Sequence, residues 1–497
     1  MPRSYNNFLS AAKKKFSQYS IIDVVKSAIY VSPLAIIRLL CGFLRSKLSA
    51  IIVGVEGVGL LGQANQFLLL VTTLGSLGMV TSFMQQMTRF RELKNTEKLN
   101  TLKGTVFLSQ LSFMLVFIFA FLFAYLPVTS FFFNSTNSTF SYLILAIVIL
   151  CPLNVIASNY LEGFFTAYHR YDLYVKASSI VTILSLIIFV PAVIFWKTDG
   201  GLFSIIGGEI LNFSLFLYYV LRIEKIKNIF LFRFSKAIFT LTFRDGIINL
   251  LCSFLLLFCG MLIRQIVIKQ TGEFKNGIYQ FCLSITAYYT PFLTNLLWAK
   301  YFPIISAKGL TDETRQIIQN TLNFIIIVSS AIMVSILIFS EILIRILATS
   351  NFLSARQYLP VQFMGDFWYF LFYTYTIYLL AVRSVKKYLI ITTIFLSSQY
   401  LLAKILVNYW SLIGVVAGYT LSSFAAGILV VYFFSKIITD KPSQFYLKVA
   451  TAFIFVSTEA IFTIIGVNAV FKIILFVAWL YWFARPVLNK KTPITIT

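Results

Sequence analysis

The chain is dominated by long apolar runs that recur along its length and are separated by short polar segments. A helix needs about 20 apolar residues to cross a bilayer. The runs lie at 27–53, 58–87, 104–126, 140–163, 177–196, 202–221, 246–269, 277–302, 319–347, 361–382, 389–409, 412–435, 449–466 and 469–484. This pattern predicts an all-α polytopic membrane protein with about 14 spans, or 12 if the last two runs form one helix or lie on the membrane.

The composition agrees with this class. Of the 497 residues, 59% are hydrophobic and only 12% are charged, whereas soluble domains have about a quarter charged residues. The net charge is +24, but the basic residues form short clusters between apolar runs, which is typical of cytoplasmic loops. We therefore expect a lipid bilayer around the chain and no nucleic acid partner.

No motif in the sequence indicates catalysis. It has no phosphate-binding loop for ATP and no recognisable carboxylate pair or nucleophile constellation. The five cysteines fall inside apolar runs without disulfide or zinc spacing. The expectation is a transporter that runs on gradients, with no catalytic residue, metal or cofactor.

The distribution of Lys and Arg predicts the orientation. With the N-terminus inside, the inner segments carry about 29 of these residues and the outer loops about 5. Both termini are then cytoplasmic, and the bias persists through the last two runs, which favours 14 spans. No outer loop exceeds about 15 residues, so no extracellular domain is expected.

The chain divides into five predicted parts, because a basic connection separates two sets of six runs. A faint internal similarity at a shift of about 219 residues pairs Arg45 with Arg264 and predicts two six-helix lobes around a central cavity. The linker alternates basic and bulky apolar residues and is expected to lie with its apolar face on the membrane surface. The parts are a cytoplasmic N-terminal segment (1–26), an N-lobe (27–221), a cytoplasmic interlobe linker (222–245), a C-lobe (246–435) and a C-terminal hairpin with a cytoplasmic tail (436–497).

Three cations lie within the first apolar run. Arg38 is near its centre, where an ionised side chain costs roughly 2.5–3.5 kcal/mol on insertion scales. This cost favours a position of Arg38 in the interior of the protein, where it would contact an anion. Arg45 is seven residues further on and shares the helix face of Arg38. Lys47 is turned about 180° away, so either the helix bends or Lys47 extends to the outer surface.

Further charges fall inside other runs. Arg264 and Asp366 are predicted at similar depth, either as an ion pair or as a separate anion contact and proton acceptor. Lys404 lies at comparable depth, where extension to the surface explains it equally well. Glu209 has no partner on its own helix and is the second candidate for proton coupling. Glu162 is expected to reach the inner headgroups.

Three segments carry a resemblance to a known family. They are GVEGVGLLGQANQFLLLVTTLGSLG (54–78), NGIYQFCLSITAYYTPFLTNLLWAKYFPIIS (276–306) and NFLSARQYLPVQFMGDFWYFLFYTYTIYLLAVRSVKKYLI (351–390). With these segments the chain resembles Wzx-type flippases, the O-antigen and lipid-linked oligosaccharide translocases of the multidrug/oligosaccharidyl-lipid/polysaccharide (MOP) exporter superfamily. The similarity extends over most of 27–435.

The resemblance implies two six-helix lobes that form a V-shaped cavity opening alternately to each side of the bacterial inner membrane. It implies undecaprenyl-diphosphate-linked oligosaccharide as cargo, H⁺ or Na⁺ as coupling ion, and polysaccharide polymerase and chain-length proteins as further partners. Family cavity cations match Arg38, Lys47 and Arg264, and the family's acidic position matches Asp366. Glu162, Glu209 and Lys300 depart from the pattern, as does the C-terminal hairpin.

The predicted site therefore has two sets of residues. The diphosphate-binding set is Arg38, Arg45, Lys47, Arg264 and Lys404, and the ion-coupling set is Asp366 and Glu209. Six aromatic residues are candidates for stacking on sugars, although packing and interfacial belts account for any one of them as well. They are Tyr288, Tyr289, Trp298, Trp368, Tyr369 and Tyr373.

The sequence thus predicts a flippase that moves O-antigen repeat units from the cytoplasmic to the periplasmic leaflet by alternating access. One alternative is a multidrug or organic-cation antiporter of the same superfamily, which should have an acidic cavity. Another is a glycan polymerase or ligase acting on lipid-linked sugars, which should have a large outer loop. A passive scaffold would leave Arg38 unexplained.

Overall fold

The computed structural model of the chain describes residues 21–134, 138–438 and 442–488, and these residues form helices and short connections without strands. The all-α prediction is therefore confirmed. Most of the predicted N-terminal segment, and the end of the C-terminal tail, lie outside the described residues.

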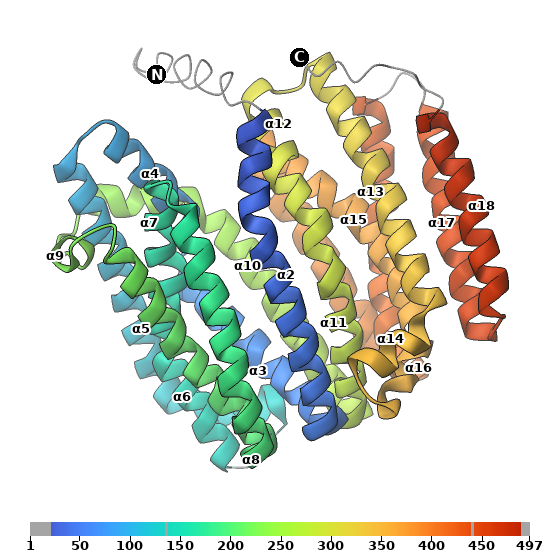
Figure 1. Cartoon of the computed structure of the whole chain (residues 1–497), viewed down its shortest axis with the longest axis horizontal. Coiled ribbons are helices and arrows are strands. Elements are labelled where there is room, and N and C mark those ends of the chain that lie inside the picture. Colours follow the sequence, from blue (N-terminus) through green and yellow to red (C-terminus); the bar gives the residue numbers. More distant parts are fainter. Residues whose placement is uncertain (1–20, 135–137, 439–441, 489–497) are drawn as a thin grey trace.

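The helices of the first half follow the predicted runs (Figure 1). They are α2 (Ile21–Ile52), α3 (Gly54–Gly75), α4 (Val80–Glu92), α5 (Thr96–Phe133), α6 (Ser138–Val155), the π-helix η1 (Ile156–Leu161), α7 (Glu162–Ala167) and α8 (Tyr171–Val220).

A short helix, α9 (Ile226–Ile229), lies in the connection to the second half. The remaining helices are α10 (Lys236–Thr271), α11 (Glu273–Leu296), the π-helix η2 (Leu297–Tyr301), α12 (Phe302–Lys308), α13 (Asp312–Ile338), α14 (Ser340–Leu347), the 3₁₀-helix η3 (Ser350–Gln357), α15 (Leu359–Ala381), α16 (Val385–Ile438), α17 (Pro442–Ile465) and α18 (Ala469–Leu488).

Two of these elements are helical hairpins. α8 has 50 residues and α16 has 54, and each contains one residue with left-handed backbone, Lys197 (φ 47°) in α8 and Ser411 (φ 53°) in α16. Close approach across the turns needs glycine: a Cβ on Gly200 would lie 1.8 Å from the carbonyl oxygen of Ala192. Each hairpin therefore contains two of the apolar runs.

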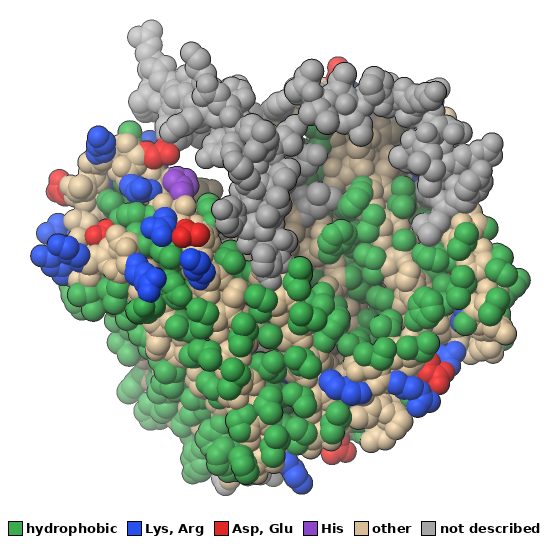
Figure 2. All heavy atoms as spheres, viewed as in Figure 1, with side chains coloured by type: hydrophobic (Ala, Val, Ile, Leu, Met, Phe, Trp, Pro, Cys, Tyr) green, Lys and Arg blue, Asp and Glu red, His purple; other side chains and the backbone are tan. Residues whose placement is uncertain are grey.

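The molecule presents a largely apolar surface. Figure 2 shows hydrophobic side chains over much of the visible face, with Lys and Arg gathered toward its margins. Within the described ranges, eight helices are long and apolar enough to cross a membrane: α3, α5, α6 with η1 and α7, α8, α10, α13, α16 and α17. The structure is thus that of a multi-pass membrane protein, and the choice between 12 and 14 spans stays a prediction.

The hydrophobic core separates along the chain. Two clusters of buried residues lie in the first half, and the largest cluster is built mainly from α10 to α17. Figure 1 shows α2 crossing between these two halves, with α17 and α18 at one edge of the molecule. α17 packs on α13 and α15 of the second half, and α18 packs on α13.

The two halves meet through backbone contacts at glycine. α3 packs on α11, and a Cβ on Gly277 would lie 1.9 Å from the carbonyl oxygen of Val55. A Cβ on Gly59 would lie 2.7 Å from the backbone nitrogen of Gly277. Any side chain at these positions would separate the two helices, so glycine sets how closely the halves approach here.

The interlobe linker packs on the first half. The hydroxyl of Tyr160 donates to the carbonyl oxygen of Ile229, which is fully buried, and the backbone nitrogen of Ser235 donates to Thr105 Oγ1 (3.0 Å). Phe230 packs against the ring of Phe107 with centroids 5.0 Å apart. The expected position on the membrane surface describes only part of the linker, because its apolar residues also find partners on η1 and α5.

Candidate anion-binding cavity

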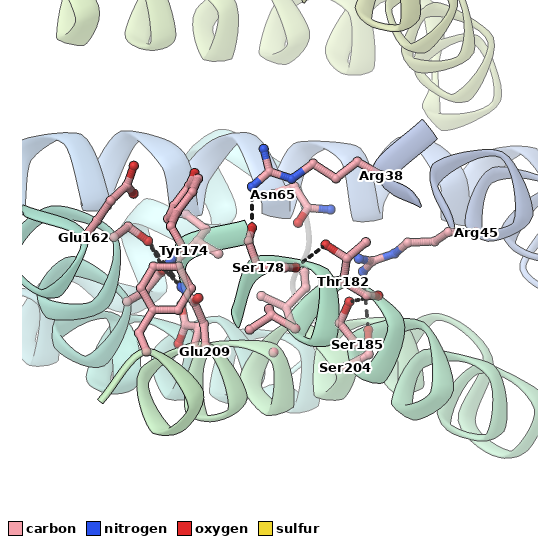
Figure 3. Close-up of a pocket in the computed structure, with 18 residues that line it drawn as sticks. Arg38, Arg45, Asn65, Glu162, Tyr174, Ser178, Thr182, Ser185, Ser204 and Glu209 are labelled. Carbon is pink, nitrogen blue, oxygen red and sulfur yellow. Dashed lines mark hydrogen bonds between the residues drawn. The ribbon is translucent and has the colours of Figure 1, made fainter. Parts of the chain in front are cut away.

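A cavity of about 290 Å³ lies within the first half, between α2, α3, α6, η1, α7 and α8 (Figure 3). It brings two guanidinium groups, Arg38 and Arg45, together with two carboxyl groups, Glu162 and Glu209. The cations come from α2, and the carboxyl groups come from α7 and α8. The remaining polar wall is made of uncharged hydroxyl and amide side chains.

Arg38 and Arg45 reach the same cavity because α2 is a continuous helix and seven residues make about two turns. Arg38 Nη2 donates to Ser178 Oγ (2.6 Å). Arg45 lies with its guanidinium carbon 4.6 Å from the centroid of the Phe189 ring, and its Nη2 is 3.5 Å from Ser204 Oγ. Both guanidinium groups contact only neutral partners through these bonds and keep donors for an anion.

Glu162, which the sequence places near the inner headgroups, lines the same cavity as Arg38. The charges of the two side chains interact, and Tyr174 lies next to both. The π-helix η1 directly precedes Glu162, and the wider turn of a π-helix rotates the side chains that follow it relative to a regular α-helix. The 3.6-residue periodicity of an α-helix does not reveal a π-helical turn. The local sequence signal is Pro152, which lies upstream in α6.

An amide and hydroxyl network lines the same wall. Asn154 Oδ1 accepts from Ser158 Oγ (2.9 Å) and from Asn212 Nδ2 (3.0 Å), which also lies 3.2 Å from Ser158 Oγ. The network connects α6, η1 and α8. Sequence reasoning missed these residues, because a single Asn or Ser in an apolar run has no pattern that assigns it to a site.

Glu209 is the carboxyl group without a partner in this cavity. Its side chain is 3% exposed, and neither carboxylate oxygen has a hydrogen-bond partner within the described part of the chain. An ionised carboxylate in this position is costly, because it has lost hydration without gaining a bond.

Lys47 does not line the cavity. Its Nζ donates to the carbonyl oxygens of Arg345 (2.6 Å) and Ala348 (2.5 Å), at the C-terminal end of α14. A cation is favoured there, because the last carbonyl groups of a helix have no partner within it. The conflict over the direction of Lys47 is resolved without a bend in α2: it points to the second half, opposite Arg38.

Arg264 is also outside the cavity. It is 4% exposed, its Nε donates to Gln66 Oε1 (2.5 Å), and its Nη2 donates to Gln280 Oε1. Gln66 belongs to α3 and Gln280 to α11, so Arg264 bridges the two halves next to their glycine contact.

Asp366 lies within the second half and accepts three hydroxyl hydrogen bonds, from Tyr289 (2.6 Å), Tyr419 (2.7 Å) and Thr286 (2.9 Å). Among the ion pairs of the described ranges, none joins Asp366 to Arg264, and the roles of the two residues as anion contact and proton acceptor stay predictions. Lys404 is exposed on α16, as expected of a side chain that extends to the surface.

Comparisons with known proteins agree with the fold. The family described as polysaccharide biosynthesis protein matches residues 24–308. An inward-facing multidrug resistance MATE family transporter of the MOP superfamily superposes with a TM-score of 0.70 at 14% identity, covering 83% of this chain and 99% of its own. The lipid II flippase MurJ, in an inward closed conformation, gives 0.67 at 14% identity, covering 94% and 100%.

A MOP superfamily transporter from Pyrococcus furiosus Vc1, described as having a binding pocket of reverse polarity, gives a TM-score of 0.59 at 15% identity, with 85% and 96% covered. A comparison with curated protein sequences finds no match. Since the family match spans more than half of the sequence and the fold is that of MOP superfamily transporters, the chain belongs to the polysaccharide biosynthesis protein family.

Proposed function

We propose that the protein is a flippase that moves an undecaprenyl-diphosphate-linked oligosaccharide, the repeat unit of O-antigen, from the cytoplasmic to the periplasmic leaflet of the bacterial inner membrane. The observation that supports this most is the pair of guanidinium groups, Arg38 and Arg45, in one cavity inside a membrane protein. The similarity to the fold of a lipid II flippase supports a lipid-linked cargo.

The physical argument starts from the diphosphate. It carries about two negative charges, and moving it through hydrocarbon without compensation is prohibitive. Guanidinium groups bind phosphate oxygens through paired N–H donors, and they remain charged in a membrane interior. Arg38 and Arg45 replace part of the water that the diphosphate loses, while the isoprenoid chain stays in lipid.

Alternating access requires contacts between the halves that break and form. The bonds from Lys47 of α2 to the end of α14, and from Arg264 of α10 to Gln66 of α3, are such contacts. In the proposed cycle they hold one side closed, and after they separate, these cations are free to meet the diphosphate. Glu209 and Asp366 are the proposed sites for a coupling H⁺ or Na⁺.

A second candidate is an organic-cation antiporter, which Glu162 and Glu209 in the cavity favour. The two guanidinium groups oppose it, because a cationic cargo would be repelled by Arg38 and Arg45 at short range. The diphosphate cargo fits both kinds of charge better, since it binds to the cations and leaves the carboxyl groups to hold protons.

The test is transport in proteoliposomes that contain an isoprenyl-diphospho-oligosaccharide, with its exposure in each leaflet measured by an impermeant glycan-modifying enzyme. Arg38→Ala and Arg45→Ala should each lower the initial rate at least about tenfold, since a charge-assisted hydrogen bond contributes about 1.5–3 kcal/mol. Lys387→Ala, which removes an exposed cation of α16 that is outside the predicted binding set, should keep the normal rate.

A normal rate in the Arg38→Ala, Arg45→Ala double variant would refute the proposed function. Accumulation of an organic cation that depends on Glu209 would instead support the antiporter. Running the assay with and without a pH gradient and a Na⁺ gradient identifies the coupling ion.

A further inference from the structure

A second cavity, of about 230 Å³, lies within the other half of the molecule. Its walls come from α10, η2, α15 and α16, and its fifteen lining residues include no Lys, Arg, His, Asp or Glu. Aromatic rings form much of the wall: Trp298, Tyr369, Phe372, Tyr373, Tyr388 and Phe395. It therefore differs in kind from the charged cavity that Arg38 and Arg45 line.

The rings of the aromatic wall contact one another. Trp298 Nε1 donates to the hydroxyl of Tyr373 (3.0 Å), and the ring of Tyr373 stacks on Tyr369 with centroids 6.0 Å apart. Tyr369 in turn packs against Phe395 (5.9 Å), which packs against Phe372 (4.7 Å). Trp298 also contacts the ring of Phe302 (5.2 Å) and is still 44% exposed.

Polar groups are interleaved with the rings. Asn249 and Ser253 are exposed on α10 and line the cavity. Thr392 is 8% exposed, and its hydroxyl has no hydrogen-bond partner in the part of the chain that the structure describes. A buried hydroxyl without a bond is unfavourable, and a ligand with hydroxyl groups would satisfy it.

The structure separates the six aromatic residues that the sequence proposes for sugar contacts. Trp298, Tyr369 and Tyr373 line this cavity. Tyr289 instead donates to Asp366, and Trp368 packs at 6% exposure against other rings. Tyr288 packs edge-on against Phe43, with centroids 4.5 Å apart. Three of the six candidate residues therefore line this cavity. Residue type alone does not distinguish them from the other three.

We propose that this cavity binds an uncharged sugar residue of the lipid-linked cargo; the identity of that cargo rests on the proposed function. The apolar C–H faces of a sugar ring pack on aromatic faces, while its hydroxyl groups bond to amides and hydroxyls, and this wall has both. A diphosphate finds no cation here. An isoprenoid chain has no hydrogen-bonding group for Thr392, Asn249 or Ser253.

The two cavities then match the two chemical parts of one headgroup. Charged groups in the first half take the diphosphate, and the uncharged aromatic wall in the second half takes sugar. A glycosylated headgroup therefore contacts the aromatic wall, whereas a bare isoprenyl diphosphate does not.

The experiment measures the affinity of the purified full-length protein for two probes: a short-chain isoprenyl diphosphate and the same lipid carrying a neutral disaccharide on its diphosphate. Trp298→Ala should weaken binding of the glycosylated probe about fivefold to tenfold and leave the bare probe unchanged, the size expected for loss of one aromatic contact. Trp410→Ala is the matched control, because Trp410 is 57% exposed and lies outside the cavity.

Tyr373→Phe, which removes the hydroxyl that accepts from Trp298, is a second variant that keeps the ring and the packing. It should weaken the glycosylated probe in the same direction, by a smaller factor. Equal weakening of both probes by Trp298→Ala would show that the cavity holds the lipid chain, and no weakening of either would show packing only. Both results would overturn the proposal.

A third arm separates this proposal from the proposed function. Arg38→Ala should weaken both probes equally; if it weakens neither, the diphosphate assignment fails. The free disaccharide, without lipid or diphosphate, is then tested by tryptophan fluorescence. A shift in the wild type that is missing in Trp298→Ala supports the sugar site on its own, and the absence of any shift, together with no preference for the glycosylated probe, overturns it.

Discussion

At the scale of single residues, Glu209 is the buried carboxyl group of the cavity that Arg38 and Arg45 line. The charged and titratable groups around it are Arg38 and Arg45 on α2, Glu162 on α7, Tyr174 on its own element and Cys151 on α6. An ionised Glu209 would repel a diphosphate held by the two guanidinium groups, and a protonated one would not. Proton binding to Glu209 and anion binding therefore favour each other.

This linkage predicts a pH dependence. Binding of an isoprenyl diphospho-sugar, whose diphosphate diester has no proton to lose near neutral pH, should tighten as the pH falls. Glu209→Gln should bind about as tightly at high pH as the wild type does at low pH, a gain of about tenfold, or about 1.4 kcal/mol. Isothermal titration calorimetry between about pH 5 and 8 measures it.

The matched control is Glu459→Gln, since Glu459 is a buried glutamate of α17 that lies outside the cavity. That variant should keep the pH dependence of the wild type. If Glu209→Gln still binds more tightly at low pH, another group in the cavity takes up the proton, and Glu162 is the next to replace.

At the scale of elements, the contact of α3 with α11 depends on the absence of side chains. Gly59 and Gly277 let the two backbones touch, and Arg264 joins Gln66 and Gln280 beside them. Small residues permit this close approach between helices in a membrane, where dispersion contacts replace the hydrophobic driving force. Wider separation of the helices would also separate the amide groups that Arg264 bridges.

Gly277→Ala should therefore lower stability. Its Cβ would meet the carbonyl oxygen of Val55 at 1.9 Å, so the helices must move apart, and overpacking of this kind costs about 1–3 kcal/mol. Gly208→Ala is the control, because nothing lies within 4 Å of its Cβ. Thermal unfolding in detergent should show a lower midpoint for Gly277→Ala only; equal midpoints would mean that the contact contributes nothing to stability.

Most of the helices could be predicted from the sequence, because length and hydropathy determine which runs become helices in a bilayer. The shared face of Arg38 and Arg45 followed from a spacing of seven. The position of Glu162 could not be predicted, since the π-helix before it departs from the periodicity on which such reasoning depends. The glycine contact and the aromatic cavity depend on which helices become neighbours, and that is set by tertiary packing.

At the scale of the whole molecule, the interlobe linker binds to the first half through the side chain of Glu224. It thereby holds the start of the second half against the first half. Lys103 Nζ lies 3.3 Å from Glu224 Oε2, and Lys103 is 1% exposed. Glu224 also accepts from Tyr168 (2.6 Å) and from Asn228 Nδ2 (2.8 Å). Burial by itself would raise the pKa of Glu224, but the hydrogen bonds from Asn228 and Tyr168 and the charge of Lys103 hold that pKa below its usual value.

Glu224→Gln should destabilise the protein by about 3 kcal/mol, because it leaves the charge of Lys103 buried without a counter-charge. Thermal unfolding measures it, and Asp312→Asn, which removes an exposed partner of Arg315, should change nothing. The double variant Lys103→Met, Glu224→Gln should recover most of the loss. A loss as large in the double variant as in Glu224→Gln would mean that the ion pair is not the cause.

The depressed pKa of Glu224 also gives the direction of an acid effect. A carboxyl group whose pKa is lower in the folded state contributes stability above its unfolded pKa and loses it as the pH falls through the folded value. The linker should therefore loosen only in acid below the usual range of a glutamate, and remain attached to the first half at neutral pH.

The bonds that Lys47 makes across the two halves are of a kind that a comparison of homologous sequences does not detect. Its acceptors are main-chain carbonyl oxygens of Arg345 and Ala348, which every amino acid supplies. Substitutions at those two positions leave the acceptors in place, so no compensating change at position 47 is selected. Methods that infer spatial proximity from correlated substitutions will thus overlook this contact between the halves, however many homologous sequences are aligned.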